Sequence, residues 1–125
     1  MDFKKLANQY RDELLDNVLP FWLEHSQDLE FGGYFSCLDR EGKVFDTDKF
    51  IWLQGREVWM FSMLYNKVEK RQEWLDCAVQ GGEFLKKYGH DGNYNWYFSL
   101  DRSGRPLVEP YNIFSYTFAT MAFGQ

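Results

Sequence analysis

The chain has 125 residues, of which 45% are hydrophobic and 20% aromatic, and its formal net charge is −5. This length fits one domain at most, and the apolar content predicts a packed core rather than a disordered chain. Acidic and basic residues are interspersed without a basic run, which argues against nucleic acid and anionic membranes as partners. No segment resembles a signal peptide or a transmembrane span, so we expect a cytoplasmic protein.

The first part of the chain has the pattern of an amphipathic helix followed by a hairpin. Apolar residues at spacings of three and four predict a helix over about 2–27, and Pro20 should kink or split it near Leu19. A loop is predicted over 26–33. Residues 34–45 then favour a short β-hairpin that turns at 39–42.

Three further helices are predicted beyond this hairpin. One covers about 49–65, with Asp46, Thr47 and Asp48 as candidates for its N-cap. The next covers about 72–88 and is broken by a glycine-containing turn. The last begins near residue 111 and is still helical in pattern at residue 125.

A hairpin sequence occurs twice. The pattern of residues 34–43 recurs at 97–105, with one residue deleted and an offset of 63. Helical segments flank both copies, so the unit is a helix, a hairpin and a helix. A fixed period of this length predicts a repeat architecture whose units stack on one another. Because the last helix is apolar to its end, we expect the chain to be the N-terminal part of a longer protein.

Arg56 is the strongest candidate for a functional residue. It lies in an apolar, aromatic-rich helix, and a guanidinium is costly to bury without a partner. Gly55 beside it adds a second local cost in a helix interior, which suggests a site. The alternative is that Arg56 caps carbonyls or pairs with Glu57 or Asp48. The apolar residues expected to crowd Arg56 are Ile51, Trp52, Val58, Trp59 and Phe61.

Other kinds of site find little support. No phosphate-binding loop or nucleophile elbow occurs, and no residues have metal-ligand spacing. Cys37 and Cys77 lack CxxC spacing and are expected to be reduced thiols. His25 and His90 are expected to be solvated rather than catalytic. The remaining candidate carboxylates are assigned to turns and caps: Asp28, Glu30, Asp39 and Asp101.

Four segments together resemble the N-acylglucosamine 2-epimerase family, whose members include the renin-binding proteins. The most specific is Trp-Leu-Gln-Gly-Arg-Glu-Val-Trp-Met over 52–60. The resemblance is closer to the N-acylglucosamine branch than to the cellobiose 2-epimerase or mannose isomerase branches. The other segments are Phe-Trp-Leu-Glu-His-Ser over 21–26, Gly-Gly-Tyr-Phe-Ser-Cys-Leu over 32–38 and Gly-Gly-Glu-Phe-Leu over 81–85.

The resemblance implies an all-α fold of a particular kind. The family fold is an (α/α)6 barrel, in which six helical hairpins close around a sugar cleft, with short β-hairpins between helices. Six units of about 63 residues would make a barrel of roughly 380 residues. Residues 1–125 would then be the N-terminal part, about the first third, of a single barrel domain.

The resemblance also implies an isomerase that interconverts N-acetylglucosamine and N-acetylmannosamine, or a related aldose. The C2 proton is removed and returned through an enediolate, which two histidine bases do best near neutral pH. Arg56 matches the arginine that holds O1 or the ring oxygen, and the histidines are expected beyond Gln125. The 125-residue chain alone is therefore expected to be inactive.

The same resemblance suggests other properties of the sugar site. Trp52, Trp59 and Tyr116 are the expected substrate-binding residues, and Phe114 stands where cellobiose-type members have a tyrosine. No cofactor or metal is required, although a nucleotide such as ATP stimulates some members. The expected partner is a small-molecule sugar, and the full-length protein is expected to form a homodimer.

Two other functions remain open. A six-hairpin glycoside hydrolase would need a pair of carboxylates as acid and base, and no such pair is evident. A non-catalytic interaction fragment would instead bind a partner through an exposed aromatic face.

Overall fold

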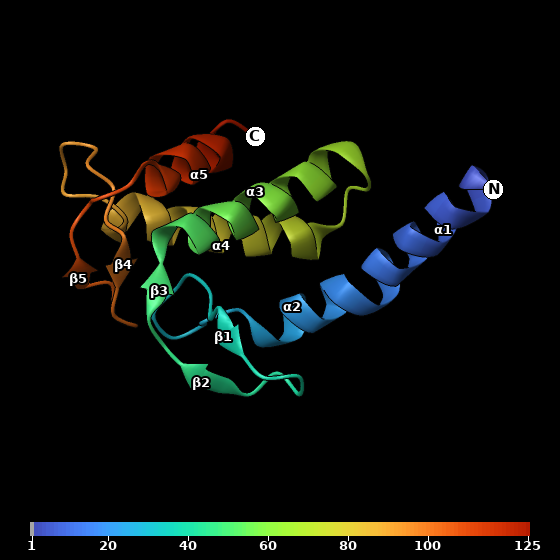
Figure 1. Cartoon of the computed structure of the whole chain (residues 1–125), viewed down its shortest axis with the longest axis horizontal. Helices are drawn as coiled ribbons and strands as arrows, with labels where there is room; N and C mark the ends of the chain where they lie inside the picture. Colours follow the sequence, from blue (N-terminus) through green and yellow to red (C-terminus); the bar gives the residue numbers. More distant parts are fainter. Residues whose placement is uncertain (1) are drawn as a thin grey trace.

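The computed structural model describes residues 2–125, and its first three elements form one helical rod that projects from the rest of the chain (Figure 1). These are α1 (Phe3–Glu13), the π-helical turn η1 (Leu14–Val18) and α2 (Leu19–His25). Pro20 lies in the first turn of α2, and the Leu19 N–H just before it donates to the Leu14 carbonyl. Because proline has no N–H to donate, the helix widens here, and the predicted irregularity near Leu19 is confirmed.

The two predicted hairpins are both present. The first pairs β1 (Cys37–Leu38) with β2 (Val44–Asp46), and the second pairs β4 (Ser99–Leu100) with β5 (Pro106–Val108). Both pairs are antiparallel and very short, so most of the described chain outside the helices is loop.

The turns of the two hairpins share the same backbone hydrogen bonds. The Asp39 N–H donates to the Lys43 carbonyl, and the Asp101 N–H donates to the Arg105 carbonyl. Gly42 and Gly104 occupy matching places at φ of 82° and 93°, a region that favours glycine. The sequence repeat is thus a repeat of backbone structure.

The start of the third helix differs from the prediction. Lys49 and Phe50 form a strand, β3 (Lys49–Phe50), whose residues pair with Leu100 and Ser99 of the second hairpin. Helix α3 (Ile51–Lys67) therefore begins two residues later than predicted, and Phe50 occupies its N-cap position. Asp46, Thr47 and Asp48 do not cap it, because pairing with a distant strand keeps residues 49 and 50 extended.

Helix α3 is the central element of the described chain. Helix α4 (Gln72–Tyr88) and helix α5 (Ile113–Phe123) both pack against it (Figure 1). A Cβ atom on Gly55 would lie 2.8 Å from the backbone carbonyl carbon of Phe118. The interpretation of Gly55 as a sign of a site is therefore wrong, because this glycine lets α3 and α5 approach closely.

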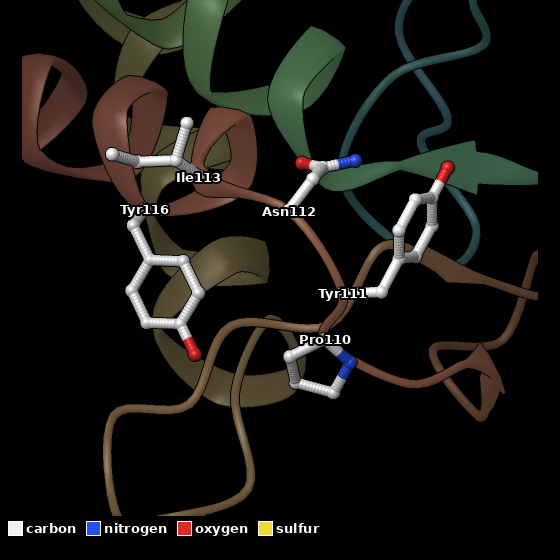
Figure 2. A pocket seen from close by; sticks show the side chains of 5 residues that line it. All are labelled: Pro110, Tyr111, Asn112, Ile113 and Tyr116. Atoms are coloured by element: carbon white, nitrogen blue, oxygen red, sulfur yellow. The ribbon is translucent and has the colours of Figure 1, made fainter.

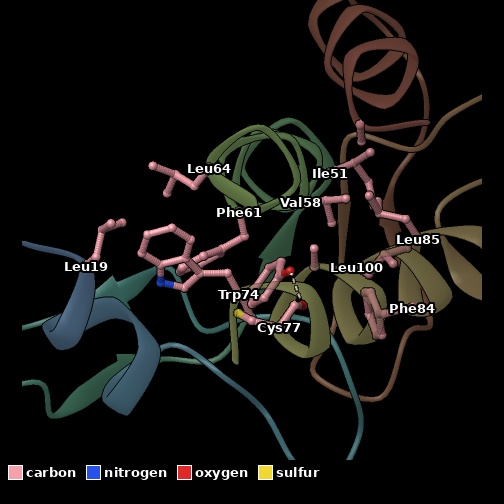
Figure 3. Close-up of a cluster of buried hydrophobic side chains, with 13 residues drawn as sticks. Leu19, Ile51, Val58, Phe61, Leu64, Trp74, Cys77, Phe84, Leu85 and Leu100 are labelled. Atoms are coloured by element: carbon pink, nitrogen blue, oxygen red, sulfur yellow. Dashed lines mark hydrogen bonds between the residues drawn. The ribbon is translucent and has the colours of Figure 1, made fainter. Parts of the chain in front are cut away.

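The hydrophobic core lies mainly between α3 and α4 (Figure 3). The Tyr34 hydroxyl reaches into it and donates to the Cys77 carbonyl at 2.7 Å. Gly81 on α4 leaves the space that the Tyr34 ring fills. The fully or nearly fully buried apolar residues include Leu19, Ile51, Val58, Phe61, Leu64, Trp74, Phe84, Leu85 and Leu100.

A charge cluster formed by Asp28, Lys49 and Arg102 joins the two repeat units, and the side chains of Asp28 and Lys49 are buried while that of Arg102 is partly exposed. Lys49 Nζ donates to Asp28 Oδ2 at 2.9 Å and to the carbonyls of Gly32 and Arg102. Arg102 donates to both carboxylate oxygens of Asp28, at 2.9 and 3.0 Å. The cluster thus links the loop after α2, strand β3 and the turn of the second hairpin.

Cys37 and Cys77 are both free thiols. Within residues 2–125, none of the helices combines the length and the apolar character needed to cross a membrane.

Candidate functional site

A cavity of about 380 Å³ lies between the helical rod and α3. This volume is at the lower end of the range for small-molecule sites in proteins. Two of the lining residues belong to the rod and one to the loop before β1, while α3 supplies the rest. The residues that line the cavity are Val18, Trp22, Ser36, Leu53, Arg56, Glu57, Trp59 and Met60.

Arg56 lies in this cavity, and its environment differs from the prediction. Its side chain is exposed rather than crowded, because the core residues of α3 lie on the opposite side of the helix. No residue among 2–125 forms an ion pair with Arg56, so the alternative of pairing with Glu57 or Asp48 is wrong. An exposed guanidinium that lines a cavity is available for a ligand oxygen.

Trp59 lies with Arg56, whereas Trp52 and Tyr116 lie elsewhere. Trp59 lines the same cavity, and Trp22 of the rod provides a second indole. The Trp52 ring packs instead against Phe118 of α5, with 5.9 Å between ring centroids. Of the four predicted site residues, the structure thus brings two into one cavity.

Tyr116 lines a separate hollow of about 410 Å³ at the start of α5 (Figure 2). Its ring extends from the helix toward Pro110, while Tyr111 and Ile113 form the rest of the wall together with Asn112. Tyr111 and Ile113 are 68% and 71% exposed, so this hollow is shallow and open. It encloses a ligand less well than the cavity at Arg56.

Glu57 also lines the cavity, although it was not predicted to be a site residue. Its Oε1 atom lies 2.5 Å from the Ser26 hydroxyl at the end of α2. Burial raises the pKa of Glu57 to about 8, although the Ser26 contact acts in the opposite direction. At neutral pH the carboxyl group is therefore mostly protonated and uncharged.

Ser36 reaches the cavity because Tyr34, two positions earlier, is hydrogen-bonded to α3. The Tyr34 N–H donates to Gln54 Oε1, and Gln54 Nε2 donates to the Tyr34 carbonyl, both at 2.8 Å. These two hydrogen bonds between the buried Gln54 side chain and the loop hold the loop against the helix. Ser36 Oγ is shielded from solvent and has no hydrogen-bond partner among residues 2–125.

Helical spacing contained a signal for Glu57. Gln54 and Phe61, three residues before and four residues after it, are both fully buried on α3. A glutamate at i+3 and i−4 from buried residues shares their face of the helix. The approach of Ser26 and Ser36 was not predictable, because both come from outside the helix.

The cavity combines one cation, one uncharged carboxyl group, one hydroxyl and two indole rings. No group of three or more potential metal ligands occurs among residues 2–125. Polar groups that converge beside flat aromatic rings suit a ligand with many hydroxyls and an apolar face. A sugar has both features.

Comparison with known proteins gives a consistent result. The family model described as N-acylglucosamine 2-epimerase (GlcNAc 2-epimerase) matches residues 33–125. The chain is 48% identical over 118 residues to the N-acylglucosamine 2-epimerase of Mus musculus. It is 30% identical over 120 residues to the cellobiose 2-epimerase of Dictyoglomus turgidum. The higher identity to the first protein confirms the predicted closeness to the N-acylglucosamine branch.

A solved structure agrees with these relatives. The crystal structure of a sugar epimerase from a ruminal bacterium matches the chain with a TM-score of 0.84 at 27% identity. The match covers 95% of this chain and 32% of that chain. The match to the mouse relative covers 91% of this chain and 28% of the relative's length. The present chain therefore spans about three tenths of the length of the proteins it matches.

Proposed function

Because the chain belongs to the N-acylglucosamine 2-epimerase family, we propose that it is part of a carbohydrate 2-epimerase that interconverts N-acetylglucosamine and N-acetylmannosamine. The observation that carries this proposal is Arg56, an exposed guanidinium without an ion pair among residues 2–125, in a cavity with two indole rings. The 48% identity to a protein named for this activity supports the choice of sugar.

The proposed chemistry assigns Arg56 an electrostatic role. Epimerisation requires the open-chain aldehyde, loss of the C2 proton and its return from the opposite face. The intermediate is an enediolate, and a fixed guanidinium near O1 stabilises the negative charge that develops there. Arg56 is the proposed partner of O1 or the ring oxygen. The two bases are proposed to be histidines beyond Gln125, since neither His25 nor His90 lines this cavity.

The proposed architecture is an (α/α)6 barrel of six helical hairpins, of which residues 1–125 form the N-terminal part. The two stacked hairpin units and the length of the relatives support it. In the closed barrel, Trp59 would form part of the sugar site with Arg56. Trp52 and Tyr116 would join them only if further elements complete the walls around α3 and α5.

Further properties are proposed from the family. The enzyme requires no cofactor, a nucleotide such as ATP stimulates it, and the full-length protein is a cytoplasmic homodimer. Its small-molecule partner is the sugar substrate. Glycoside hydrolysis is not favoured, because Glu57 is the one carboxylate among the residues that line the cavity.

The test is turnover by the full-length protein that contains this chain. Interconversion of the two N-acetylhexosamines is followed by NMR, with and without ATP, for the wild type and for Arg56→Ala. Loss of an oxyanion partner should lower kcat/KM by about 100-fold or more. Arg40→Ala, at an exposed arginine in the first hairpin turn, is the matched control and should retain wild-type turnover.

Two outcomes would contradict the proposal. Wild-type protein that converts neither sugar would reject the activity. An Arg56→Ala protein with wild-type kcat/KM would reject the site. A circular-dichroism melt shows whether the Arg56→Ala protein is folded. Because Arg56 is exposed, the melting temperature of this variant should equal that of the wild type.

A further inference from the structure

Glu57 projects from the same helix as Arg56 into the same cavity, but no role follows for it from the activity proposed above. An ionised carboxylate there would lie beside the guanidinium and would oppose the negative charge of an enediolate. Whether Glu57 carries a charge therefore matters for any reaction at this site.

The geometry at Ser26 is compatible with a proton on Glu57. Ser26 Oγ is 2.6 Å from the Trp22 carbonyl and 2.5 Å from Glu57 Oε1. A serine hydroxyl has one proton to donate, and the Trp22 carbonyl can only accept. If the serine proton is donated to Trp22, the short contact with Glu57 requires a proton on the carboxyl group. The Glu57 O–H is then directed at Ser26, and the other carboxyl oxygen remains as an uncharged acceptor.

Ser36 provides an independent indication of a ligand. Its hydroxyl lines the cavity and is shielded from solvent without a hydrogen-bond partner among residues 2–125. A buried polar group without a partner is destabilising, which is why such groups are rare in native structures. A ligand hydroxyl in the cavity would supply the missing partner.

We propose that neutral Glu57 and Ser36 form, beside Arg56, an uncharged polar subsite that hydrogen-bonds a hydroxyl of the sugar. Glu57 offers an acceptor oxygen and Ser36 offers a hydroxyl, while the positive charge of Arg56 is left uncompensated for the reacting oxygen. This subsite rests on the proposed epimerase function. Ionisation of Glu57 at alkaline pH would place a negative charge in the cavity and reduce turnover.

Among the groups that surround Glu57, none other is expected to titrate between pH 7 and pH 9. Tyr34 approaches from the loop before β1 and Cys77 from α4, and burial is the largest cause of the raised pKa of each. The pKa of Cys77 is raised to about 12 and that of Tyr34 well above its usual value. Ser26 faces Glu57 from α2 and carries no charge, whereas Arg56 on the same helix as Glu57 carries the guanidinium.

The test compares kcat/KM for N-acetylglucosamine at pH 9 and pH 7 in the full-length protein. For a group that titrates near pH 8, the wild-type value should fall about tenfold between these pH values. Glu57→Gln keeps an uncharged acceptor oxygen but cannot ionise, so its ratio should be close to 1. Glu83→Gln, at an exposed glutamate of α4, is the matched control and should keep the wild-type ratio.

Two further measurements separate a role in the site from a role in folding. Ser36→Ala should raise the KM for N-acetylglucosamine about fivefold, the equivalent of one hydrogen bond, with no change in the pH 9 to pH 7 ratio. Infrared spectra of the wild type at pH 7 should contain a carboxylic-acid C=O band that Glu57→Gln lacks.

The outcomes distinguish this inference from the proposed function. A wild type that epimerises the sugar while Glu57→Gln shows the same alkaline fall, or lacks the infrared difference, would overturn the subsite alone. A wild type that turns over neither N-acetylhexosamine at any pH would overturn both.

Discussion

Gly81 lies directly against the hydroxyl end of Tyr34, and the space that a Cβ atom would need is filled by the tyrosine ring. Gly82, the next residue along α4, has no neighbouring atom within 4 Å of its Cβ position. Two adjacent glycines in one helix thus differ in their packing environment. The first makes room for a side chain from the first hairpin unit, and the second has no packing role within residues 2–125.

Gly81→Ala and Gly82→Ala should therefore change stability in opposite directions. Gly81→Ala displaces Tyr34 and its bond to Cys77, and should lower the free energy of unfolding by about 1–3 kcal/mol. Gly82→Ala improves helix propensity and should raise it by about 0.5–1 kcal/mol. Urea denaturation of both variants measures the difference. Equal effects of the two changes would contradict the assigned role of Gly81.

Lys49→Met should strongly destabilise the chain. The side chains of Lys49 and Asp28 are 0% and 1% exposed, so removing the cation leaves a buried carboxylate with one fewer partner. Breaking a buried pair in this way costs about 3–5 kcal/mol, and the two remaining hydrogen bonds from Arg102 favour the lower value.

The control for this change is Arg11→Met, which removes the cation of an exposed pair with Asp12. Exposed pairs contribute about 0–1 kcal/mol, so chemical denaturation should show little effect. A Lys49→Met protein as stable as Arg11→Met would show that the charge cluster contributes nothing to stability.

The stability of the chain in acid should depend on Asp28. Burial alone would raise its pKa, but hydrogen bonds from Arg102 and Lys49 outweigh burial and lower the pKa to about 2. The folded state thus binds this proton less readily than the unfolded state, whose aspartates titrate near pH 4. The stabilisation is present above about pH 4 and is lost as the pH falls through about 2.

Asp28→Asn removes this titration. Its free energy of unfolding should be lower than that of the wild type at pH 7, but should decrease less between pH 4 and pH 2. Asp12→Asn, at an exposed aspartate of α1, serves as the comparison and should retain the wild-type slope. Parallel curves for Asp28→Asn and the wild type would reject the lowered pKa.

Glu57 should make the free energy of unfolding decrease as the pH rises, whereas Asp28 makes it decrease as the pH falls. Its pKa is raised from about 4.5 to about 8 in the folded state, so folding favours the protonated form. That stabilisation is complete below about pH 4.5 and is lost as the pH rises through about 8. Thermal melts of Glu57→Gln should vary less than those of the wild type between pH 5 and pH 9. An identical pH dependence in the two proteins would show that Glu57 titrates normally.

The secondary structure was largely predictable because its signals are local. Helix α4 has the predicted bounds, and the two hairpin turns follow from their repeated aspartate and glycine residues. The start of α3 was not predictable, since Lys49 and Phe50 are extended only through pairing with Leu100 and Ser99, which lie 51 and 49 positions later. The long-range strand pairing outweighs the local preference of these residues for a helix.

The candidate site was predictable in part for the same reason. Arg56 and Trp59 share one side of α3, and a helix brings residues three apart together wherever it folds. The exposure of Arg56 was not predicted, because Ile51, Val58 and Phe61, which were expected to crowd it, are buried on the other side of the helix. Ser26, Ser36 and the position of Tyr116 depend on how separate elements pack.

The charge cluster also has a consequence for the order in which the chain matures on the ribosome. Asp28 and Arg102 are separated by 74 positions, so the arginine emerges well after the carboxylate that it contacts. At usual rates of synthesis the interval is roughly 4 to 15 s. During that time the first unit has Asp28 and Lys49 but lacks both the guanidinium and the strand that pairs with β3. The first unit therefore acquires all of its native contacts only after the second hairpin has been synthesised. Its folding depends on the second unit.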